Sequence, residues 1–297
     1  MKGTPANLKY YADLVEEELS RLVPEEKELF QTEIFDSCRY SLLGGGKRLR
    51  PYLCLTFYQL CGGADVRDAL TFASGIEMIH SSSLIHDDLP CMDDSDYRRG
   101  KLSNHKVYGE TMAVLAGDAL LIRAFEAMSC PKQNIEPANL LRALHAMGTA
   151  SGVYGMVGGQ VIDLDMEGKI CTSEQLWKMV ELKTGALICG SCKSGACLAG
   201  ASEELQEAAY QYGLCIGLAF QIRDDLLDLT GDAELVGKPL GSDAENDKNT
   251  FASVYGIEKC EAMIAELTER ALTHAEAFGA GAEQLKALAM WLLDRAY

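Results

Sequence analysis

Helical periodicity is the feature of this sequence that most constrains its fold. In almost every segment of the 297-residue chain, apolar residues recur three and four positions apart. No convincing run of alternating β-branched residues bounded by turn signals interrupts this pattern. A chain of this length can bury about 75% of the surface that it exposes when unfolded, which is enough for a large core. The sequence therefore predicts an all-α protein.

The breaks between the expected helices are short. Thr172 and Gln175 match a capping box, ahead of a helix that we expect to run through Lys183. Glycine, proline and polar residues interrupt the helical pattern at LLGGGKRLRP, CGGAD, CPKQNIEP and TGDAELVGKPLGSDAEND. Because none of these breaks is a long, low-complexity linker, we expect residues 1–297 to form a single domain.

Charge and composition exclude several classes of function. The net charge of -17 argues against a nucleic-acid partner, because such binding depends on lysines and arginines that displace counterions from phosphate. No apolar run approaches the ~20 residues that cross a bilayer, and the first residues do not resemble a signal peptide. We therefore expect a cytoplasmic protein with no transmembrane segment. Its eleven cysteines, including Cys189, Cys192 and Cys197, are expected to be reduced core residues.

An acidic stripe is expected on the helix that contains FQIRDDLLDL. At ~100° per residue, its carboxylates and one glutamine fall within roughly 100° of arc. Three carboxylates on one face repel each other unless a cation neutralises them, and hard oxygen ligands of this kind suit Mg²⁺. The flanking residues are apolar, which argues against a solvated acidic surface. The stripe consists of Gln221, Asp224, Asp225 and Asp228.

A first acidic cluster, HDDLPCMDDSDYRRGK at residues 86–101, needs a local irregularity to act in the same way. Asp87 and Asp93 are six positions apart, so on an unbroken helix they would point about 120° away from each other. Pro90 lacks an amide hydrogen, so the chain could absorb two extra residues there and return Asp93 to the face of Asp87. The cluster holds Asp87, Asp88, Asp93, Asp94 and Asp96, of which the last two have no assigned role.

Two such helices could face each other in a bundle with Mg²⁺ between them, and Mg²⁺ bound by few carboxylates keeps positions for phosphate oxygens. Basic residues elsewhere support a phosphorylated ligand. Lys47, Arg48 and Arg50 follow three glycines, and His80 lies two helical turns before Asp87. The pair Arg98 and Arg99 could clamp a diphosphate through bidentate hydrogen bonds.

Taken together, these motifs resemble those of the short-chain trans-isoprenyl diphosphate synthases, and most closely the bacterial farnesyl diphosphate synthase type. The resemblance runs from about Gly44 to Thr250. It implies a helical bundle around a central cavity, with two facing aspartate-rich helices, and it implies a homodimer. The motifs that carry it are GGGKRLRP, SLIHDDLPCMDDSDYRRGK, GGQVIDLD, ELKTGALI, FQIRDDLLDLTGD and GKPLGSD.

The resemblance also implies roles for individual residues. Three Mg²⁺ ions would be bound chiefly by Asp87, Asp93 and Asp224, with support from Asp88 and Asp228. Isopentenyl diphosphate would be bound by Lys47, Arg50, His80 and Arg99. The allylic diphosphate would be bound by Arg98, Lys183, Thr184, Gln221 and Lys238, with a further contact from Lys248. The residues expected to support catalysis directly are Asp87, Asp88, Asp93, Asp224, Asp225, Asp228, Arg98 and Lys183.

The implied reaction is a head-to-tail condensation. Mg²⁺ and the cations would stabilise departing pyrophosphate, and isopentenyl diphosphate would attack the allylic carbocation in a water-poor pocket. The length of the product is the open point. The fifth residue before the first aspartate is often aromatic in farnesyl synthases of this type, but here it is Ser82, followed by Ser83. We expect farnesyl diphosphate as the product, with geranylgeranyl diphosphate as the alternative.

Three other functions remain open. A terpene cyclase also pairs an acidic motif with Mg²⁺, but its second motif usually reads N-x-x-x-S/T-x-x-x-E, where this chain has DDLLD. His86 and Asp87 resemble the doublet of metal-dependent phosphohydrolases, which need more histidine ligands than a chain with five histidines readily offers. A non-catalytic subunit of a heteromeric synthase would not need both acidic motifs intact.

Overall fold

A computed structural model describes residues 5, 7–131, 133–230 and 249–293, and within these ranges the protein is almost entirely helical. A two-stranded hairpin supplies the only β-structure of the described residues. The all-α prediction is therefore confirmed. The N-terminal half contains α1 (Leu8–Leu22), α2 (Thr32–Leu42), α3 (Leu49–Leu60), η1 (Val66–Ala69), α4 (Leu70–Asp87), β1 (Tyr97–Arg98), β2 (Lys101–Leu102), α5 (Asn104–Tyr108) and α6 (Glu110–Met128).

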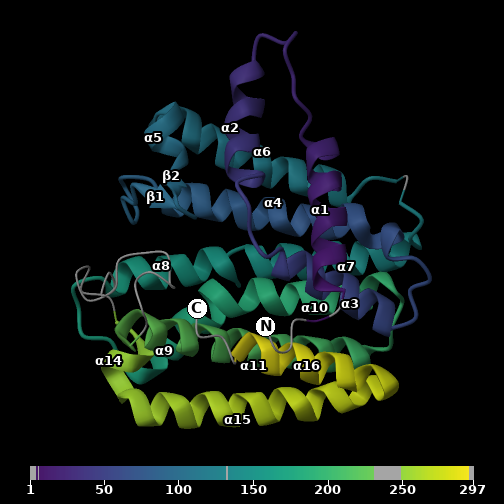
Figure 1. Cartoon of the computed structure of the whole chain (residues 1–297), viewed down its shortest axis with the longest axis vertical. Coiled ribbons are helices and arrows are strands. Elements are labelled where there is room, and N and C mark those ends of the chain that lie inside the picture. The colour runs from purple at the N-terminus through teal and green to yellow at the C-terminus, as the bar shows by residue number, and fades with distance from the viewer. Residues whose placement is uncertain (1–4, 6, 132, 231–248, 294–297) are drawn as a thin grey trace.

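The second half of the chain adds the other side of the bundle. Its elements are α7 (Pro137–Ser151), α8 (Met156–Met166), α9 (Ser173–Val180), η2 (Glu181–Gly185), α10 (Ala186–Leu198), α11 (Glu203–Thr230), α14 (Phe251–Tyr255), α15 (Ile257–Ala275), η3 (Glu276–Gly281) and α16 (Ala282–Leu293). Helices α4 and α6 pack together, as do α11 and α15, while α10 contacts α3, α7 and α11 (Figure 1). Helix α10 is thus the central helix between the two halves.

Small residues allow α10 to occupy this central place. An added Cβ at Gly195 would lie 2.2 Å from the carbonyl oxygen of Cys54 on α3. One at Gly213 of α11 would lie 2.9 Å from the Cα of Cys189. Cys189, Cys192 and Cys197 are all buried and free, as the sequence predicts for reduced core residues. These cysteines and glycines bring the backbones of neighbouring helices into close contact.

Replacing Gly195 with alanine is expected to destabilise the protein by roughly 1–3 kcal/mol, because the new methyl group meets backbone that has no room to move. Gly148→Ala is the matched control: an added Cβ at this helical position meets nothing within 4 Å. There alanine should stabilise by about 0.5–1 kcal/mol through helix propensity. Urea unfolding of both variants checks the difference, and equal midpoints would contradict the packing argument.

The chain changes its helical geometry at residues 181–185. The capping box at Thr172 is present, as predicted, with the Gln175 amide nitrogen 3.2 Å from the Thr172 hydroxyl. The α-helix that it opens ends at Val180, however, and a π-helical turn follows (Glu181–Gly185) before α10 begins. The prediction of one helix through Lys183 is therefore wrong in this detail. Such π-helical turns are frequent at functional sites, and this one carries Lys183 and Thr184.

No helix in the described part of the chain is long and apolar enough to cross a membrane. The segment GKPLGSD, with Lys238, and the later Lys248 lie outside the described residues.

Candidate active site

Helix α4 ends at Asp87, and the chain then folds back on itself. Pro90 has no amide hydrogen to continue the helix, and the His86 carbonyl instead accepts a hydrogen bond from the Leu89 amide at 3.2 Å. The amide of Asp93 donates to the carbonyl of Asp87 at 2.9 Å. The turn therefore brings Asp93 back beside Asp87, as the sequence predicts, but it does so after the helix has ended.

Negative charge is concentrated at this turn. Burial raises the pKa of Asp87 to about 6, Lys183 opposes this rise, and the carboxylate of Asp93 adds to it. A buried carboxylate whose ionised form is disfavoured by burial and by a neighbouring carboxylate makes a site that a cation would stabilise. The acidic turn is thus suited chemically to the divalent cation that the sequence predicts.

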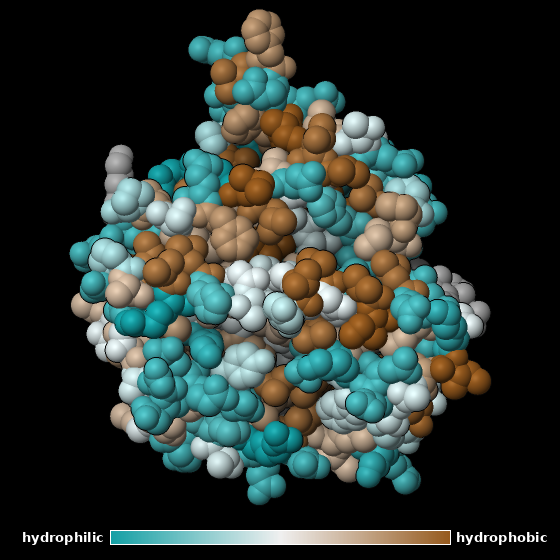
Figure 2. Space-filling view, turned by 180° about the vertical axis from the view of Figure 1, so that it is seen from behind, coloured by the Kyte–Doolittle hydropathy of each residue, from teal (hydrophilic) through white to brown (hydrophobic). Residues whose placement is uncertain are grey.

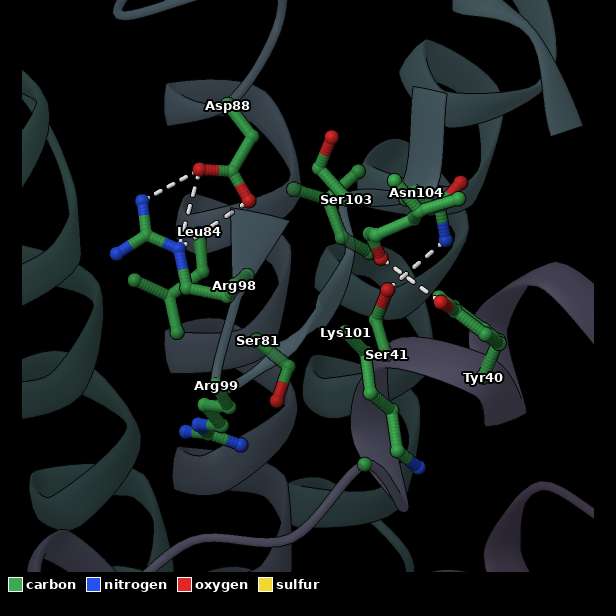
Figure 3. A pocket seen from close by; sticks show the side chains of 13 residues that line it. Tyr40, Ser41, Ser81, Leu84, Asp88, Arg98, Arg99, Lys101, Ser103 and Asn104 are labelled. Carbon is green, nitrogen blue, oxygen red and sulfur yellow. Dashed lines mark hydrogen bonds and ion pairs between the residues drawn. The ribbon is translucent and has the colours of Figure 1, made fainter. Parts of the chain in front are cut away.

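Asp88 contacts the hairpin. The Arg98 Nε lies 3.0 Å from one oxygen of the Asp88 carboxylate, and the Arg98 Nη2 donates to the same oxygen (Figure 3). Asp88 is buried at 2% exposure. The hairpin also places Arg99, whose Nη1 donates to the carbonyl of Gly45. Asp88 therefore holds the hairpin and its two arginines against the end of α4.

Basic side chains from α3 and from the loop before it lie near His80, which is two turns before Asp87 on α4. The Arg50 Nη1 is 3.4 Å from the His80 Nε2. Burial lowers the pKa of His80 well below its ordinary value, and the charge of Arg50 lowers it further, so that the ring is neutral near pH 7. Lys47 is exposed, in the loop that leads to α3. These side chains make the basic rim that the sequence predicts.

Arg48 has a different function from its neighbours. Its side chain is fully buried, and its Nη1 is 2.7 Å from Glu77 while its Nε is 2.7 Å from Glu16. It adopts a left-handed backbone conformation with φ of 50° directly before α3. Arg48 therefore anchors the glycine-rich loop between α1 and α4, and that anchoring positions Lys47 and Arg50. The family resemblance assigns a binding role to Lys47 and Arg50 but none to Arg48, and the buried pairing of Arg48 with Glu77 explains this difference.

Replacing Glu77 with glutamine is expected to cost about 3–5 kcal/mol of stability, because it leaves the buried charge of Arg48 without its main partner. Glu16→Gln removes the partly exposed partner of the same arginine, whose carboxylate is 38% exposed, and should cost about 1 kcal/mol or less. Chemical denaturation of both variants measures the two losses. Equal small losses of stability would show that the buried Arg48–Glu77 ion pair stabilises the protein no more than the partly exposed Arg48–Glu16 pair.

The charged groups open into a cleft of about 660 Å³, which is in the usual range for small-molecule sites. Ser82 is buried at 3% exposure and lines the cleft together with Ser83. No aromatic side chain stands at either of these two positions. The polar lining residues include Arg50, His80, Asp87, Lys183 and Thr184, and the apolar ones include Leu121, Phe125, Met156, Val157 and Leu164. The cleft is therefore amphipathic, with both charged and apolar side chains in its lining.

Two residues of the second acidic cluster, Gln221 and Asp225, line a smaller cavity of about 140 Å³. Asp225 is buried and accepts hydrogen bonds from the Gln221 side chain at 2.9 Å and from the Phe251 amide at 2.8 Å. Asp228 is buried as well, whereas Asp224 is exposed. The carboxylate of Asp225 therefore fixes the start of α14, and the predicted stripe divides into one exposed and two buried aspartates.

The π-helical turn connects the two clusters. Lys183 and Thr184 line both the large cleft with Asp87 and the smaller cavity with Asp225. The Thr184 hydroxyl donates to the Gln221 side-chain oxygen at 3.0 Å. The two acidic clusters therefore lie on either side of one turn, which carries the cation of Lys183 between them.

Sequence reasoning assigned no role to two residues of the GGQVIDLD motif. The Lys183 Nζ is 2.5 Å from a carboxylate oxygen of Asp163. Gln160 lines the large cleft, and its buried Nε2 has no hydrogen-bond partner among the described residues. An added Cβ at Gly159 would lie 2.2 Å from the Lys183 backbone nitrogen, so this glycine allows α8 to approach the π-turn. The Gly-Gly pair followed by a polar residue is the sequence signal that could have identified this motif as part of the candidate site.

This combination defines a class of proteins: a helical bundle in which two aspartate-rich helix ends and a set of cations surround an amphipathic cleft. A sequence model described as polyprenyl synthetase matches residues 31–287. The chain is 42% identical over 284 residues to a geranylgeranyl diphosphate synthase of Cyanophora paradoxa, covering 95% of this chain and 93% of the relative. It belongs to the polyprenyl synthetase family and is a trans-prenyltransferase.

Two further relatives agree with this assignment. Geranylgeranyl pyrophosphate synthase 11, chloroplastic, of Arabidopsis thaliana is 42% identical over 289 residues, which is 96% of this chain and 80% of the relative. The crystal structure of an FPP/GFPP synthase from Zymomonas mobilis superposes with a TM-score of 0.85 at 35% identity, covering 98% of this chain and all of that one. The predicted isoprenoid-synthase fold is therefore confirmed.

Proposed function

We propose that this chain condenses isopentenyl diphosphate with an allylic diphosphate and that its main product is geranylgeranyl diphosphate. The observation that carries this proposal is the cleft of about 660 Å³, which has charged side chains at one part and is bounded by Ser82 where a bulkier residue would shorten it. The names of the relatives favour geranylgeranyl over our first expectation, farnesyl diphosphate. Farnesyl diphosphate is the second candidate, because one structural neighbour is an FPP/GFPP synthase.

The acidic side chains fit Mg²⁺ chemically. Asp87, Asp93 and Asp224 offer the hard carboxylate oxygens that this ion prefers. The raised pKa of Asp87 reflects chiefly burial and in smaller part the nearby carboxylate of Asp93, and a bound cation would offset both effects. We propose these three as the principal ligands of three ions, with Asp228 and Asp88 in support. Bound Mg²⁺ would supply stabilisation of the charge that develops on the departing pyrophosphate.

The chain's own residues hold the substrates and exclude water. We propose that Arg50, His80, Arg99 and Lys47 bind isopentenyl diphosphate, while Arg98, Lys183, Thr184 and Gln221 bind the allylic diphosphate. Lys238 and Lys248 are proposed to add contacts. Asp163, at 2.5 Å, and Asp88, through its bonds to Arg98, hold the two central cations in position. The apolar wall of the cleft receives the growing chain, and its low polarity protects the carbocation from water.

A homodimer of single-domain subunits completes the proposal. Large apolar side chains are exposed on three helices, where a second copy could cover them. They include Val114, Leu115 and Ile122 of α6, Leu141 of α7, and Val157 and Val161 of α8. Apolar side chains also gather across the middle of the face shown in Figure 2. A cytoplasmic location stays a prediction, since the Arabidopsis relative is named as chloroplastic.

Light scattering is expected to give a molar mass twice that of the 32.3 kDa chain. Ile122→Lys places a charge on a side chain that is 70% exposed, so it should lower that mass without unfolding the subunit. Asp13→Lys, on the exposed face of α1, is the control that should leave the mass unchanged. A single-chain mass for the unmodified protein would contradict the dimer.

The function is tested by incubating the pure protein with isopentenyl diphosphate, dimethylallyl diphosphate and Mg²⁺ and by analysing the prenyl products. We expect linear diphosphates and stoichiometric release of pyrophosphate. Cyclic hydrocarbons would favour a terpene cyclase, and release of phosphate without condensation would favour a phosphohydrolase. Product formed only after addition of a second subunit would favour a non-catalytic partner.

A further inference from the structure

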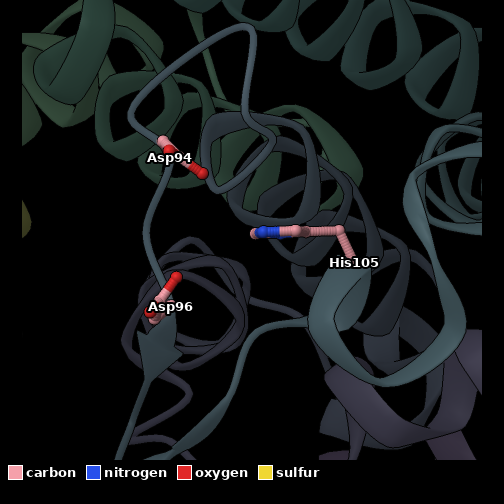
Figure 4. Close-up of side chains that lie close together, drawn as sticks. All are labelled: Asp94, Asp96 and His105. Atoms are coloured by element: carbon pink, nitrogen blue, oxygen red, sulfur yellow. The ribbon is translucent and has the colours of Figure 1, made fainter.

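Three side chains that the proposed reaction does not use lie together beside the acidic turn. One oxygen from each of Asp94 and Asp96 and one ring nitrogen of His105 all lie within 4.8 Å of one another. The two aspartates are exposed on the turn before the hairpin, whereas His105 comes from α5, and its ring points between them (Figure 4). The cluster therefore joins the chain segment that precedes the hairpin of Arg98 and Arg99 to the segment that follows it.

His105 carries the evidence that this cluster is a site. Its side chain is 6% exposed, and its Nε2 is buried without a hydrogen-bond partner among the described residues. The other ring nitrogen, Nδ1, lies 3.1 Å from the Ser103 hydroxyl. Leaving a buried imidazole nitrogen unpaired is costly. A histidine that binds a metal through one nitrogen is usually held through the other by such a partner.

The spacing within the cluster is wider than that of hydrogen bonds. None of the hydrogen bonds or ion pairs of the described residues joins His105 to either aspartate. Two ligands of a tetrahedral Zn²⁺ ion lie about 3.3–3.6 Å apart, because Zn–N and Zn–O distances are about 2.0–2.2 Å. A separation of up to 4.8 Å therefore closes onto an ion when the ligand atoms approach one another by at most about 1.5 Å. Lys106 contacts one oxygen of Asp96 at 2.7 Å, and the carboxylate has a second oxygen to offer.

We propose that Asp94, Asp96 and His105 bind a transition-metal ion, with Zn²⁺ as the best match. Imidazole nitrogen suits Zn²⁺ and is a poor ligand for Mg²⁺, so the site differs in metal preference from the aspartates proposed for catalysis. A bound ion ties the acidic turn to α5. It thereby holds in place the hairpin whose arginines are proposed to bind the two diphosphates.

The experiment is a Zn²⁺ titration of the protein in excess Mg²⁺, followed through the ¹⁵N resonances of its five histidines. Zn²⁺ is expected to move the His105 Nε2 signal into the metal-bound range. His105→Gln removes that signal, and Ser103→Ala should weaken the Zn²⁺ affinity roughly 10- to 100-fold. His145→Gln, at an exposed position on α7, is the matched control and leaves the titration unchanged.

Asp94→Asn is a second variant that tests the proposal if His105→Gln fails to fold. Asp94 is exposed and has φ of 45°, a conformation that asparagine also tolerates. This variant should fold normally and show at least a tenfold weaker effect of Zn²⁺ on the His105 signal. An unchanged His105 resonance in the parent protein, or shifts confined to His80 and His86, would overturn the proposal. Neither readout depends on condensation activity.

Discussion

Replacing Asp87 with alanine is expected to lower the turnover of allylic condensation by roughly 10²-fold or more, by analogy with the loss of preorganised charge stabilisation. Asp87 lies at the end of α4, where Asp93 and Lys183 contribute to its electrostatic surroundings. Its removal takes away a proposed ligand of the ions that stabilise pyrophosphate. Asp224→Ala is expected to have an effect of the same order. Steady-state kinetics at saturating substrate measure the loss.

The control for this experiment is Asp13→Ala. Asp13 is an exposed aspartate on α1 that forms a surface salt bridge with Lys9 at 2.7 Å, and its removal should leave turnover unchanged. Circular dichroism and thermal unfolding establish that the variants are folded. Near-normal turnover of Asp87→Ala or Asp224→Ala would refute the assignment of these carboxylates.

Replacing Ser82 with phenylalanine is expected to shift the main product from geranylgeranyl to a shorter prenyl diphosphate. Ser82 is 3% exposed and lines the cleft five residues before Asp87, so a large ring there occupies space that the last isoprene unit needs. Ser82→Ala keeps the side chain small and should leave the product unchanged. Chromatography of the dephosphorylated products compares the two variants. Identical products would show that the side chain at position 82 does not limit the length of the product.

Much of the fold could be predicted from local patterns. Helical periodicity indicated the all-α class, and the Thr172 capping box located the start of α9. The return of Asp93 to Asp87 also followed from local chemistry, because Pro90 prevents a regular helix. The π-helical turn at Lys183 was not predictable in this way. Its position depends on the close approach of α8 at Gly159, which is a tertiary contact.

In the candidate site, too, some features follow from the local sequence and others depend on tertiary contacts. Arg48 and Arg50 are two positions apart in one basic motif, yet Arg48 is fully buried against Glu77 whereas Arg50 lies beside His80 in the cleft. The two side chains take different places because Arg48 has a left-handed backbone conformation and because Glu77 of α4 pairs with it. Similarly, Asp225 belongs to the acidic stripe by sequence, but its carboxylate accepts from the Phe251 amide across 26 residues. Partners so distant in sequence cannot be deduced from spacing.

The central claim is tested most directly by offering the pure protein farnesyl diphosphate as the only allylic primer, together with isopentenyl diphosphate and Mg²⁺. A cleft bounded by Ser82 should accept this longer primer, extend it by one isoprene unit and release one pyrophosphate per product. The account predicts geranylgeranyl diphosphate as the product. Failure to extend farnesyl diphosphate, in a preparation that does condense dimethylallyl diphosphate, would contradict it.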